Sequence, residues 1–390
     1  MKTKINLACM SGIAIIVLLM SNCSKGKNDD PAPNPPVTIT ITANPTSVSL
    51  PAAGGDQTFT ITTNATEWTV SAEADWLTTS KQGNSVKVSA GANSGATRNA
   101  TVRCTAGTVS ATVSVSQGQV TAQQHDSLTL TDIYTATGGA SWTHKWTLSA
   151  PMSQWYGVKL SSDGKIEELD LSDNNLSGAL PAAITELTSL KYCDLRDNNL
   201  TGAIPAGVSQ MTQLEFLDLS ENSFSGDVPA LNNLTGIVML DLSFNELTTL
   251  PSLNTLTQLE YLAFCNNNLS GALPDNLSAL VNLTYLDASN NGFTGNIPAT
   301  WSSMTKMKVF YLYSNALGGS IPNYLTSFTN LEKLALDDNN LTGNIPAALG
   351  NLPQLTELHL AQNRLTGSIP ASLLDHANWQ TWQNGVCPQQ

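Results

Sequence analysis

Charged residues are scarce in this chain, and basic ones are the scarcest. Only 12% of the residues are charged, and 17 Lys and Arg stand against 30 Asp and Glu, for a net charge of −13. Loss of an N-terminal leader with Lys2 and Lys4 would remove two positive charges and give −15. Phosphate binding needs a basic face. We therefore expect no nucleic-acid partner.

Catalytic and metal-binding motifs are also missing from the sequence. The four histidines are His125, His144, His359 and His376, and none is placed beside a Ser or Cys nucleophile with an acidic partner. The chain has no phosphate loop, no HExxH and no CxxC. We therefore expect no enzyme activity, no catalytic residues, no cofactor and no zinc site.

Cysteines are few, and their spacing predicts no disulfide. Cys9 leaves with the leader, and Cys193 takes the place of a strand leucine, which predicts a small buried side chain. Cys265 belongs to the outer strand face of the fifth repeat, several strand spacings of about 4.8 Å from the C-terminal Cys387, beyond disulfide reach. Cys104 completes the set of four in the folded part.

The N-terminus contains an apolar run from about Ala8 to Met20, which is too short to span a bilayer and follows two lysines. We predict a secretory leader over residues 1–22.

The end of this leader at Cys23 resembles a bacterial lipobox, although Asn22 departs from the small residue that this family prefers there. The resemblance implies that Cys23 is lipidated; ordinary cleavage and secretion is the alternative. SKGKNDD after the cysteine resembles the export tags of Bacteroides-type surface lipoproteins. This implies an outer-membrane, cell-surface location in which only the lipid anchor contacts the membrane, and residues 23–36 form a Pro-rich linker.

What the sequence does have is a repeat of about two dozen residues. Blocks like LEKLALDDNNLTGNIPAALGNLPQ (331–354) begin at Ile166, Leu190, Leu214, Ile237, Leu259, Leu283, Met307, Leu331 and Leu355. One block cannot bury enough apolar surface to offset the roughly 1–2 kcal/mol per residue of backbone ordering, so neighbours must share a core. LEKLALDD alternates apolar and polar residues and predicts a strand with one buried face.

Three further positions recur in the blocks. An Asn follows each strand and predicts an amide that satisfies turn backbone groups. Gly follows in eight of the nine blocks, with Thr249 as the exception, and a Pro such as Pro346 comes three residues later. Gly permits backbone conformations that a Cβ forbids, and Pro prevents an earlier helix start, so we expect short turns on the convex side.

The pattern LxxLxLxxNxLxGxIP resembles the leucine-rich repeat. The resemblance implies nine repeats over residues 166–378 that form a curved α/β solenoid with a parallel concave sheet. The tail 379–390 breaks the pattern and should cap the C-terminal end. Residues 125–165 precede the repeats; HDSLTLTDIYTAT predicts a closing helix with Leu128, Ile133 and Tyr134 inward. The segment GGASW…W…WYGV resembles the N-terminal cap of plant-type repeats without its cysteine pair, so aromatic packing should replace the disulfide.

Residues 37–118 have a different character. VTITIT, QTFTITT, SVKVSA and SATVSVSQ alternate with period two between turn-forming pieces, which predicts an all-β sandwich. With EWTV, DWL and the NSGATRNATV stretch, the region resembles a BACON domain, an immunoglobulin-like module whose family name implies carbohydrate association. Trp68 and Trp76 would be the sugar platforms; the alternative is that both pack in the core and the domain is a spacer.

The outward positions of the predicted concave strands carry the candidate ligand residues. One outward position, here called the aromatic row, reads Glu168, Tyr192, Phe216, Met239, Tyr261, Tyr285, Val309, Lys333 and Glu357. The next, the aspartate row, reads Asp170, Asp194, Asp218, Asp241, Ala263, Asp287, Tyr311, Ala335 and His359, and Phe244 and Tyr313 lie beyond it. We expect the aspartates to form a solvated acidic column; a Ca²⁺ site is a less favoured alternative.

Aromatic anchors beside charge are typical of protein interfaces. The leading hypothesis is therefore a surface-anchored protein that binds a protein partner through its concave face. The predicted ligand-binding residues are Tyr192, Phe216, Tyr261, Tyr285, Tyr311, Tyr313, Asp194, Asp218, Asp241 and Asp287. The alternatives are a glycan ligand, held by the same rings or by the sandwich, and a purely structural surface component in which the rows only stabilise the sheet.

Overall fold

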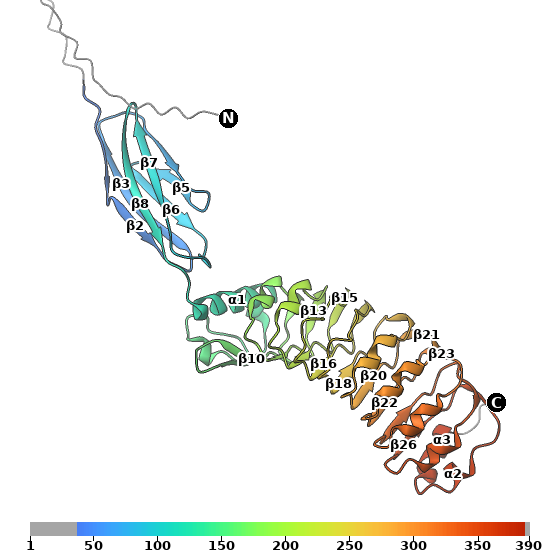
Figure 1. The fold of residues 1–390 in the computed structure, drawn as a ribbon. Helices are drawn as coiled ribbons and strands as arrows, with labels where there is room; N and C mark the ends of the chain where they lie inside the picture. Colours follow the sequence, from blue (N-terminus) through green and yellow to red (C-terminus); the bar gives the residue numbers. More distant parts are fainter. Residues whose placement is uncertain (1–36, 387–390) are drawn as a thin grey trace, which may run out of the picture.

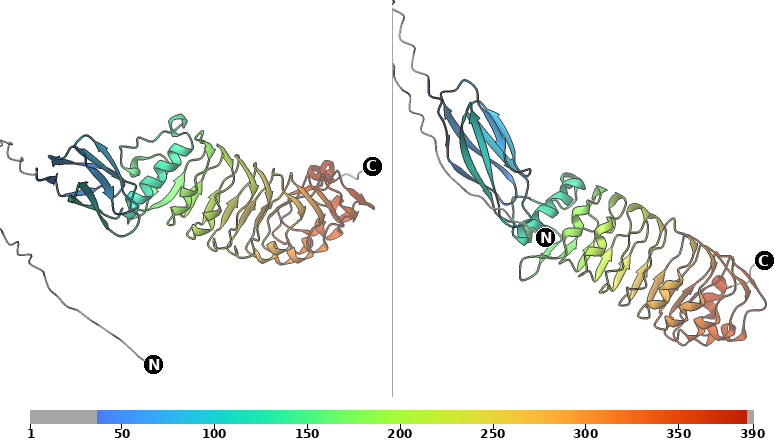
Figure 2. Two further views of the ribbon diagram at one scale, coloured as in Figure 1. Left: turned by 90° about the horizontal axis from the view of Figure 1, so that it is seen from above. Right: turned by 45° about the horizontal axis from the view of Figure 1, so that its top comes forward.

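The computed structural model describes residues 37–386 and shows a β-rich region followed by a curved stack of repeats (Figure 1). The views of Figure 2 agree with Figure 1 that the β-rich region lies beyond the N-terminal end of the stack, next to α1 (Ala122–Ala136). It therefore does not cover the long sheet of the repeats. The predicted leader 1–22, the linker 23–36 and the lipidation of Cys23 lie outside the described residues.

The N-terminal region is built from two small, mostly antiparallel sheets. One has the strand order β1 (Ile41–Asn44), β3 (Gly55–Thr63), β6 (Ser85–Ala90) and β5 (Thr78–Gln82). The other has the order β2 (Ser47–Leu50), β8 (Val109–Gln117), β7 (Arg98–Ala106) and β4 (Thr69–Ala72), in which β2 pairs with β8 in parallel. Alternate residues of these strands, such as Phe59, Val86 and Val113, fill one shared core. The period-two pattern of the sequence therefore predicted the buried faces correctly.

The repeats align their first strands into one long sheet, as the sequence predicts. The parallel strands are β10 (Ile166–Asp170), β12 (Tyr192–Asp194), β14 (Phe216–Asp218), β16 (Met239–Asp241), β18 (Tyr261–Ala263), β20 (Tyr285–Asp287), β22 (Val309–Tyr311), β24 (Lys333–Ala335) and β26 (Glu357–His359). A tenth strand, β9 (Val158–Leu160), adds to the N-terminal edge antiparallel to β10. Figure 1 shows this sheet on the inner side of the arc.

The outer side of the arc is formed by short turns and by further short strands. Six repeats have a 3₁₀ helix that begins directly after a Pro: η3 (Ala182–Glu186), η4 (Ala206–Gln210), η5 (Asp275–Ala279), η6 (Ala299–Ser303), η7 (Asn323–Ser327) and η8 (Ala347–Asn351). This confirms the predicted role of the proline. Within residues 37–386, the two shorter repeats, which begin at Leu214 and Ile237, contain no such helix.

The segments around the recurring Gly, and around Thr249 where the Gly is missing, form parallel strands that the sequence reading did not predict. They are β11 (Ser177–Ala179), β13 (Asn199–Gly202), β15 (Ser223–Asp227), β17 (Glu246–Thr249), β19 (Ser270–Ala272), β21 (Gly292–Asn296), β23 (Ala316–Gly318), β25 (Thr342–Asn344) and β27 (Arg364–Thr366). They fall into separate sheets of four, three and two strands. The recurring Gly has a positive φ, for example 79° at Gly202, a conformation that glycine adopts without strain.

The recurring Asn joins neighbouring repeats through the backbone. Asn267 accepts a hydrogen bond from the amide of Leu247 in the preceding repeat at 3.0 Å. Its Nδ2 donates to the carbonyl oxygens of Leu242 at 2.9 Å and of Phe264 at 3.1 Å. The side chain therefore pairs backbone groups of two successive turns, which confirms its predicted structural role.

Both ends of the stack are closed by helices and aromatic side chains. The predicted helix is present: Leu130 and Ile133 of α1 are fully buried, and the predicted inward residues Leu128 and Tyr134 are half-buried, with Tyr134 packed against the core. Trp142 and Trp146 pack edge to face at 4.9 Å between their ring centroids, and Trp146 stacks on Trp155 at 4.8 Å. Two 3₁₀ turns, η1 (Gly139–Ser141) and η2 (Met152–Gln154), hold this cluster, and α2 (Ala371–Leu374) and α3 (Trp379–Val386) close the other end.

Candidate binding surface on the concave sheet

Strand pairing places equivalent outward positions of successive repeats directly side by side. Tyr192 pairs with Phe216, and Asp194 pairs with Asp218, in the same register that continues to β26. Rows that the sequence defines by counting are therefore continuous rows of neighbouring side chains on one face. A ligand on this face would meet several repeats at once.

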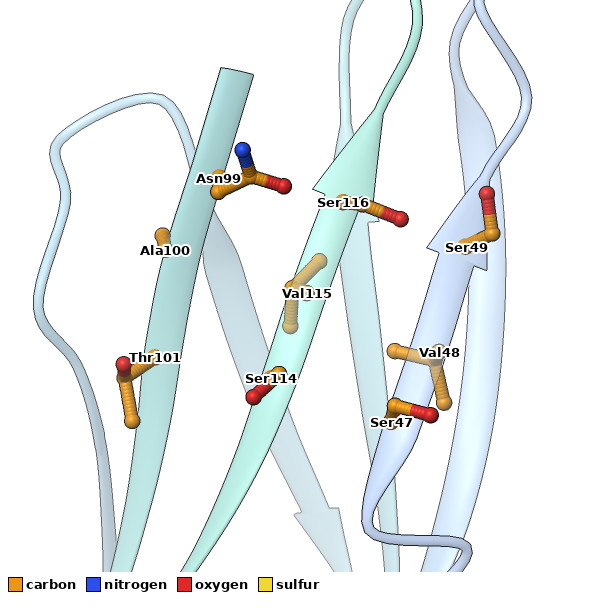
Figure 3. A pocket seen from close by; sticks show the side chains of 9 residues that line it. All are labelled: Ser47, Val48, Ser49, Asn99, Ala100, Thr101, Ser114, Val115 and Ser116. Carbon is orange, nitrogen blue, oxygen red and sulfur yellow. The ribbon is translucent and has the colours of Figure 1, made fainter. Parts of the chain in front are cut away.

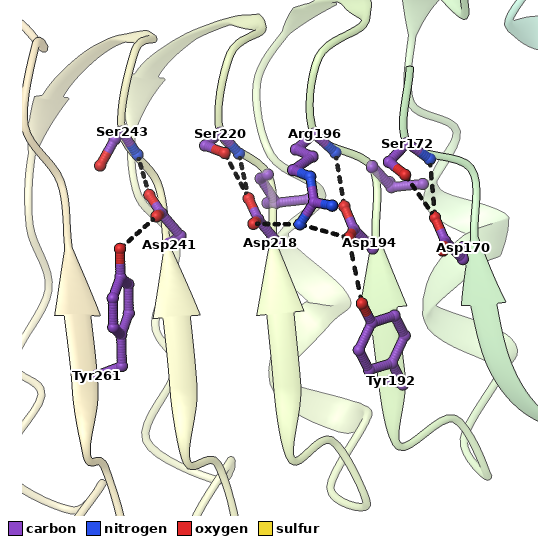
Figure 4. Close-up of polar contacts among 12 residues, drawn as sticks. Asp170, Ser172, Tyr192, Asp194, Arg196, Asp218, Ser220, Asp241, Ser243 and Tyr261 are labelled. Atoms are coloured by element: carbon purple, nitrogen blue, oxygen red, sulfur yellow. Dashed lines mark hydrogen bonds and ion pairs between the residues drawn. The ribbon is translucent and has the colours of Figure 1, made fainter. Parts of the chain in front are cut away.

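The aspartate row is not a solvated column, which corrects the expectation from the sequence. Asp194, Asp218, Asp241 and Asp287 are 0%, 3%, 9% and 7% exposed. Each carboxylate turns back to close the turn after its strand; Asp218 accepts hydrogen bonds from the amide of Ser220 at 2.9 Å and from its hydroxyl at 2.6 Å. Figure 4 shows this arrangement repeating from Asp170 to Asp241. These carboxylates therefore stabilise the turns and present little surface to a ligand.

Neighbouring side chains compensate the buried charge in the first repeats (Figure 4). Nη1 of Arg196 lies 3.0 Å from Oδ2 of Asp194 and 3.7 Å from Oδ2 of Asp218. The hydroxyl of Tyr192 donates to Asp194 at 3.2 Å. Burial raises the pKa of the Asp194 carboxyl above its ordinary value, and burial together with the Asp194 charge raises the pKa of Tyr192 to about 12. The Asp194 carboxylate therefore has both an ion-pair partner and a hydrogen-bond donor within the fold.

The rings of the aromatic row stack on one another along the sheet. The ring centroids of Tyr192 and Phe216 are 4.1 Å apart with planes at 13°, and those of Tyr261 and Tyr285 are 4.2 Å apart with planes at 10°. All four side chains are half-buried. One face of each ring is therefore covered by a neighbour, so the part of these predicted ligand residues that remains open is smaller than the sequence suggests.

The chemistry of the face changes at the seventh repeat. There the aspartate row continues with Tyr311, Ala335 and His359, and the turn-closing Asp is absent from these three repeats. A hollow of 280 Å³ forms where the small Ala335 stands between the larger side chains. The hollow is lined by Tyr311, Tyr313, Ala335, Asp337, Glu357 and His359. Of the predicted ligand residues, only Tyr311 and Tyr313 lie in it.

The hollow combines two aromatic rings with two acids. The ring centroids of Tyr311 and Tyr313 are 6.1 Å apart with planes at 66°. Glu357 is paired with Lys333 at 3.1 Å and contacts Nε2 of His359 at 3.4 Å. Asp337 is half-buried and has no ion-pair partner among residues 37–386. Glu357 and His359 were placed in the two outward rows from the sequence, but neither they nor Asp337 were among the predicted ligand-binding residues; the loss of the recurring Asp in the last repeats was the available signal.

Phe244 is a second feature of this face; the sequence placed it beside the two rows but not among the predicted ligand-binding residues. It is 51% exposed and has a φ of 54°, in the left-handed region. The other repeats fill this position with polar residues in the same conformation: Asp173, Asp197, Glu221, Asn266, Asn290, Ser314, Asp338 and Gln362. An L-residue there costs roughly 1–2 kcal/mol, least for Asn and Asp. An exposed phenyl ring at a strained position therefore points to a use outside folding.

Of the two proposed sugar platforms of the N-terminal region, Trp68 is buried and Trp76 is half-buried. Trp68 is 7% exposed and carries Nζ of Lys81 at 4.0 Å from its ring centroid. The guanidinium of Arg98 lies 4.3 Å from the centroid of the Trp76 ring. A hollow of 630 Å³ crosses β2, β8 and β7 (Figure 3), but its lining of Ser, Thr, Asn, Ala and Val contains neither an aromatic ring nor a charge. This face therefore lacks the rings on which sugars stack.

Cysteines and acids show no metal or redox centre within residues 37–386. Cys104, Cys193 and Cys265 are buried free thiols; Cys265 follows β18 at an outward position of the sheet and is 7% exposed. No group of three potential metal ligands occurs in this part of the chain. No helix within residues 37–386 has the length and apolarity that a membrane span needs.

Comparison with known proteins identifies the repeats. Residues 165–224 match one model of the leucine-rich repeat, and residues 258–280, 282–304, 330–352 and 354–375 match a second. No curated protein matches the chain in sequence.

Several solved structures share the solenoid. The leucine-rich-repeat ectodomain of the Arabidopsis thaliana receptor kinase GASSHO1/SCHENGEN3, solved with CASPARIAN STRIP INTEGRITY FACTOR 2, is 33% identical, with a TM-score of 0.61 over 65% of this chain and 31% of that one. The ectodomain of the Arabidopsis receptor kinase HAESA, solved with an IDA peptide hormone, is 28% identical, with a TM-score of 0.59 over 66% and 44%. A plant ice-binding protein is 26% identical, with a TM-score of 0.53 over 63% and 88%. This chain thus spans less than half the length of either receptor ectodomain. Its repeat region is a leucine-rich-repeat solenoid that resembles plant receptor ectodomains.

Proposed function

We propose that this chain is a non-catalytic binding protein whose concave face holds a peptide or protein partner. The observation that carries the proposal is Phe244, an exposed ring in a strained backbone position beside the concave sheet. The open, half-buried aromatic row and the hollow at Tyr311 and Tyr313 support it. The two plant ectodomains were solved with a peptide hormone and with CASPARIAN STRIP INTEGRITY FACTOR 2, which supports a binding role for this kind of solenoid.

The β-rich region would act as a spacer in this function. The buried Trp68, the Arg98 guanidinium over the ring of Trp76, and the uncharged, ring-free hollow favour a spacer over a lectin. A glycan array on the full chain checks this assignment. Binding that survives changes on the concave sheet and is lost on Trp76→Ala would assign the sugar to the β-rich region.

The cell-surface location remains part of the proposal, supported by the leader-like N-terminus and Cys23 alone. Metabolic labelling with a fatty acid, comparing the wild type with Cys23→Ala, tests it. We expect label and membrane association in the wild type, and an unlabelled, released protein in the variant.

The binding proposal is tested in two steps. The biotinylated full chain first captures partners from host and bacterial extracts, and the affinity of each purified partner is then measured for Phe244→Asn and for the control Val281→Asn. Val281 is 46% exposed and follows η5 on the outer side of the arc. Interface anchors typically contribute 1 kcal/mol or more, so we expect Phe244→Asn to weaken binding about fivefold or more. Equal affinities for the wild type and Phe244→Asn would contradict the proposal.

A further inference from the structure

The hollow in the last three repeats has the dimensions of a single side chain. Its 280 Å³ lies below the roughly 300–1,000 Å³ of sites that enclose small molecules. It opens on the concave face beside the aromatic row, where an extended peptide would pass. One side chain of such a peptide would fill it.

The charge of the hollow is negative and incompletely balanced. Glu357 is paired with Lys333, which leaves the Asp337 carboxylate without an ion-pair partner in the described part of the chain. Burial raises the pKa of Asp337 above its ordinary value, because its charged form is poorly solvated. Burial also raises the pKa of Asp194 in the second repeat, but that carboxylate has an ion-pair partner in Arg196 at 3.0 Å. A cation from outside would supply the missing partner.

The walls of the hollow favour a flat cation. Tyr311 and Tyr313 are half-buried, and their rings stand at 66° to each other, so two aromatic surfaces meet at one corner. A guanidinium stacks on such rings and offers paired N–H donors to a carboxylate. An ammonium matches the charge but not the shape. Arginine therefore fits better than lysine.

We propose that the hollow lined by Tyr311, Tyr313 and Asp337 binds an arginine side chain of the peptide or protein partner. This rests on the proposed function of the concave face and names the chemistry that it recognises. The guanidinium stacks on one tyrosine ring, meets the other at its edge and pairs with Asp337. The net negative charge of the chain attracts such a partner over longer distances.

The probe for this inference is the peptide acetyl-Gly-Arg-Gly-amide, compared with the same peptide in which citrulline replaces arginine. Citrulline keeps the shape and removes the charge. Titrations of the full chain, followed by ligand-observed NMR, give the two dissociation constants. A charged hydrogen bond contributes enough for about a tenfold preference for the arginine peptide.

Two variants and a matched control test whether the preference for the arginine peptide arises in the hollow. Asp337→Asn should reduce it to less than about twofold, and Tyr313→Leu should weaken arginine binding about threefold or more. Glu215→Gln removes the same charge from an exposed acid near the other end of the sheet and should leave the preference unchanged. Melting curves of the three variants establish that each is folded.

The inference is overturned if the wild type binds neither peptide or both equally, or if Asp337→Asn keeps the preference. Displacement by methyl α-glucoside, with no preference for arginine, would also overturn it and assign the hollow to a sugar. Its failure is separable from that of the proposed function. Partner binding that still depends on Phe244 would leave the proposed function standing; an arginine preference with partner binding unaffected by concave-face variants would reject the proposed function alone.

Discussion

The hydroxyl of Tyr261 donates a hydrogen bond to Oδ2 of Asp241 on the neighbouring strand, at 3.2 Å. The same carboxylate accepts the amide of Ser243 at 2.8 Å through Oδ1 (Figure 4). A residue chosen from the sequence as a ligand anchor therefore also satisfies a buried charge. Substitutions on this face test folding as well as binding, and the two effects must be separated.

Replacement of Tyr261 by Phe should lower the free energy of unfolding by about 1–3 kcal/mol, because the Asp241 carboxylate loses a donor while the ring stack on Tyr285 remains. Urea denaturation followed by circular dichroism measures the change. Tyr313→Phe is the control, since the Tyr313 hydroxyl has no recorded hydrogen-bond partner among residues 37–386, and it should change stability by less than about 0.5 kcal/mol. Equal effects of the two substitutions would reject this role of the Tyr261 hydroxyl.

The buried Asp241 predicts a pH dependence of stability. Burial raises its pKa above 3.8, and the charge of Asp218 adds to this rise. The folded state then binds the proton more tightly than the unfolded state, so this contribution to stability is present below the unfolded pKa and is lost as pH rises through the folded pKa. Relative to Asp241→Asn, the wild type should therefore lose stability as pH rises from 3.8 through that raised pKa.

Asp227 supplies the control with the opposite sign. Hydrogen bonds from Thr249 and Thr248 lower the pKa of this exposed carboxyl. Relative to Asp227→Asn, the wild type should gain stability as pH rises through the lowered pKa and up to the ordinary value. Urea midpoints measured over this pH range give both slopes. The same sign for the two pairs would contradict the assignment of burial as the dominant effect at Asp241.

Replacement of one recurring Asn should lower the free energy of unfolding more than its position in a loop suggests. Asn267→Ala removes the partners of the Leu247 amide and of the Leu242 carbonyl, and we expect a loss of about 1–3 kcal/mol in unfolding free energy. Asn268→Ala changes the exposed neighbour, whose backbone amide still donates to Leu247. Chemical denaturation gives the unfolding free energy of both variants. A loss for Asn268→Ala as large as that for Asn267→Ala would contradict the special role of the recurring Asn.

Phe244→Asn should stabilise the protein while it weakens partner binding. Asn occupies the same left-handed position in the next two repeats, as Asn266 and Asn290, and relief of the strain should add up to about 1 kcal/mol to the unfolding free energy. Thermal unfolding measures the gain. A lower melting temperature would show that the phenyl ring contributes packing to the fold, and would remove the argument that it is kept for binding.

The interval of the leucines and the alternation of the strands were sufficient to predict the solenoid, its long sheet and the shared core. Both are local patterns: period two selects a buried strand face, and a fixed repeat length brings equal positions together. The role of the Asn and the proline-started turns also followed from the sequence, because each depends on backbone groups within one or two neighbouring repeats. The second set of strands did not, since their short Gly-bearing segments show no periodicity of their own.

Only the tertiary structure decided which outward residues are open to a ligand. Asp194 and Tyr311 both occupy outward positions of one row, yet Asp194 is buried under its own turn and Tyr311 lines a hollow. The difference arises from neighbouring side chains: Arg196 of the same turn pairs with Asp194, whereas the small Ala335 of the next repeat lies beside Tyr311. Repetition in the sequence determined which backbone positions face outward. Packing within each turn and between repeats determined which of those side chains a partner can reach.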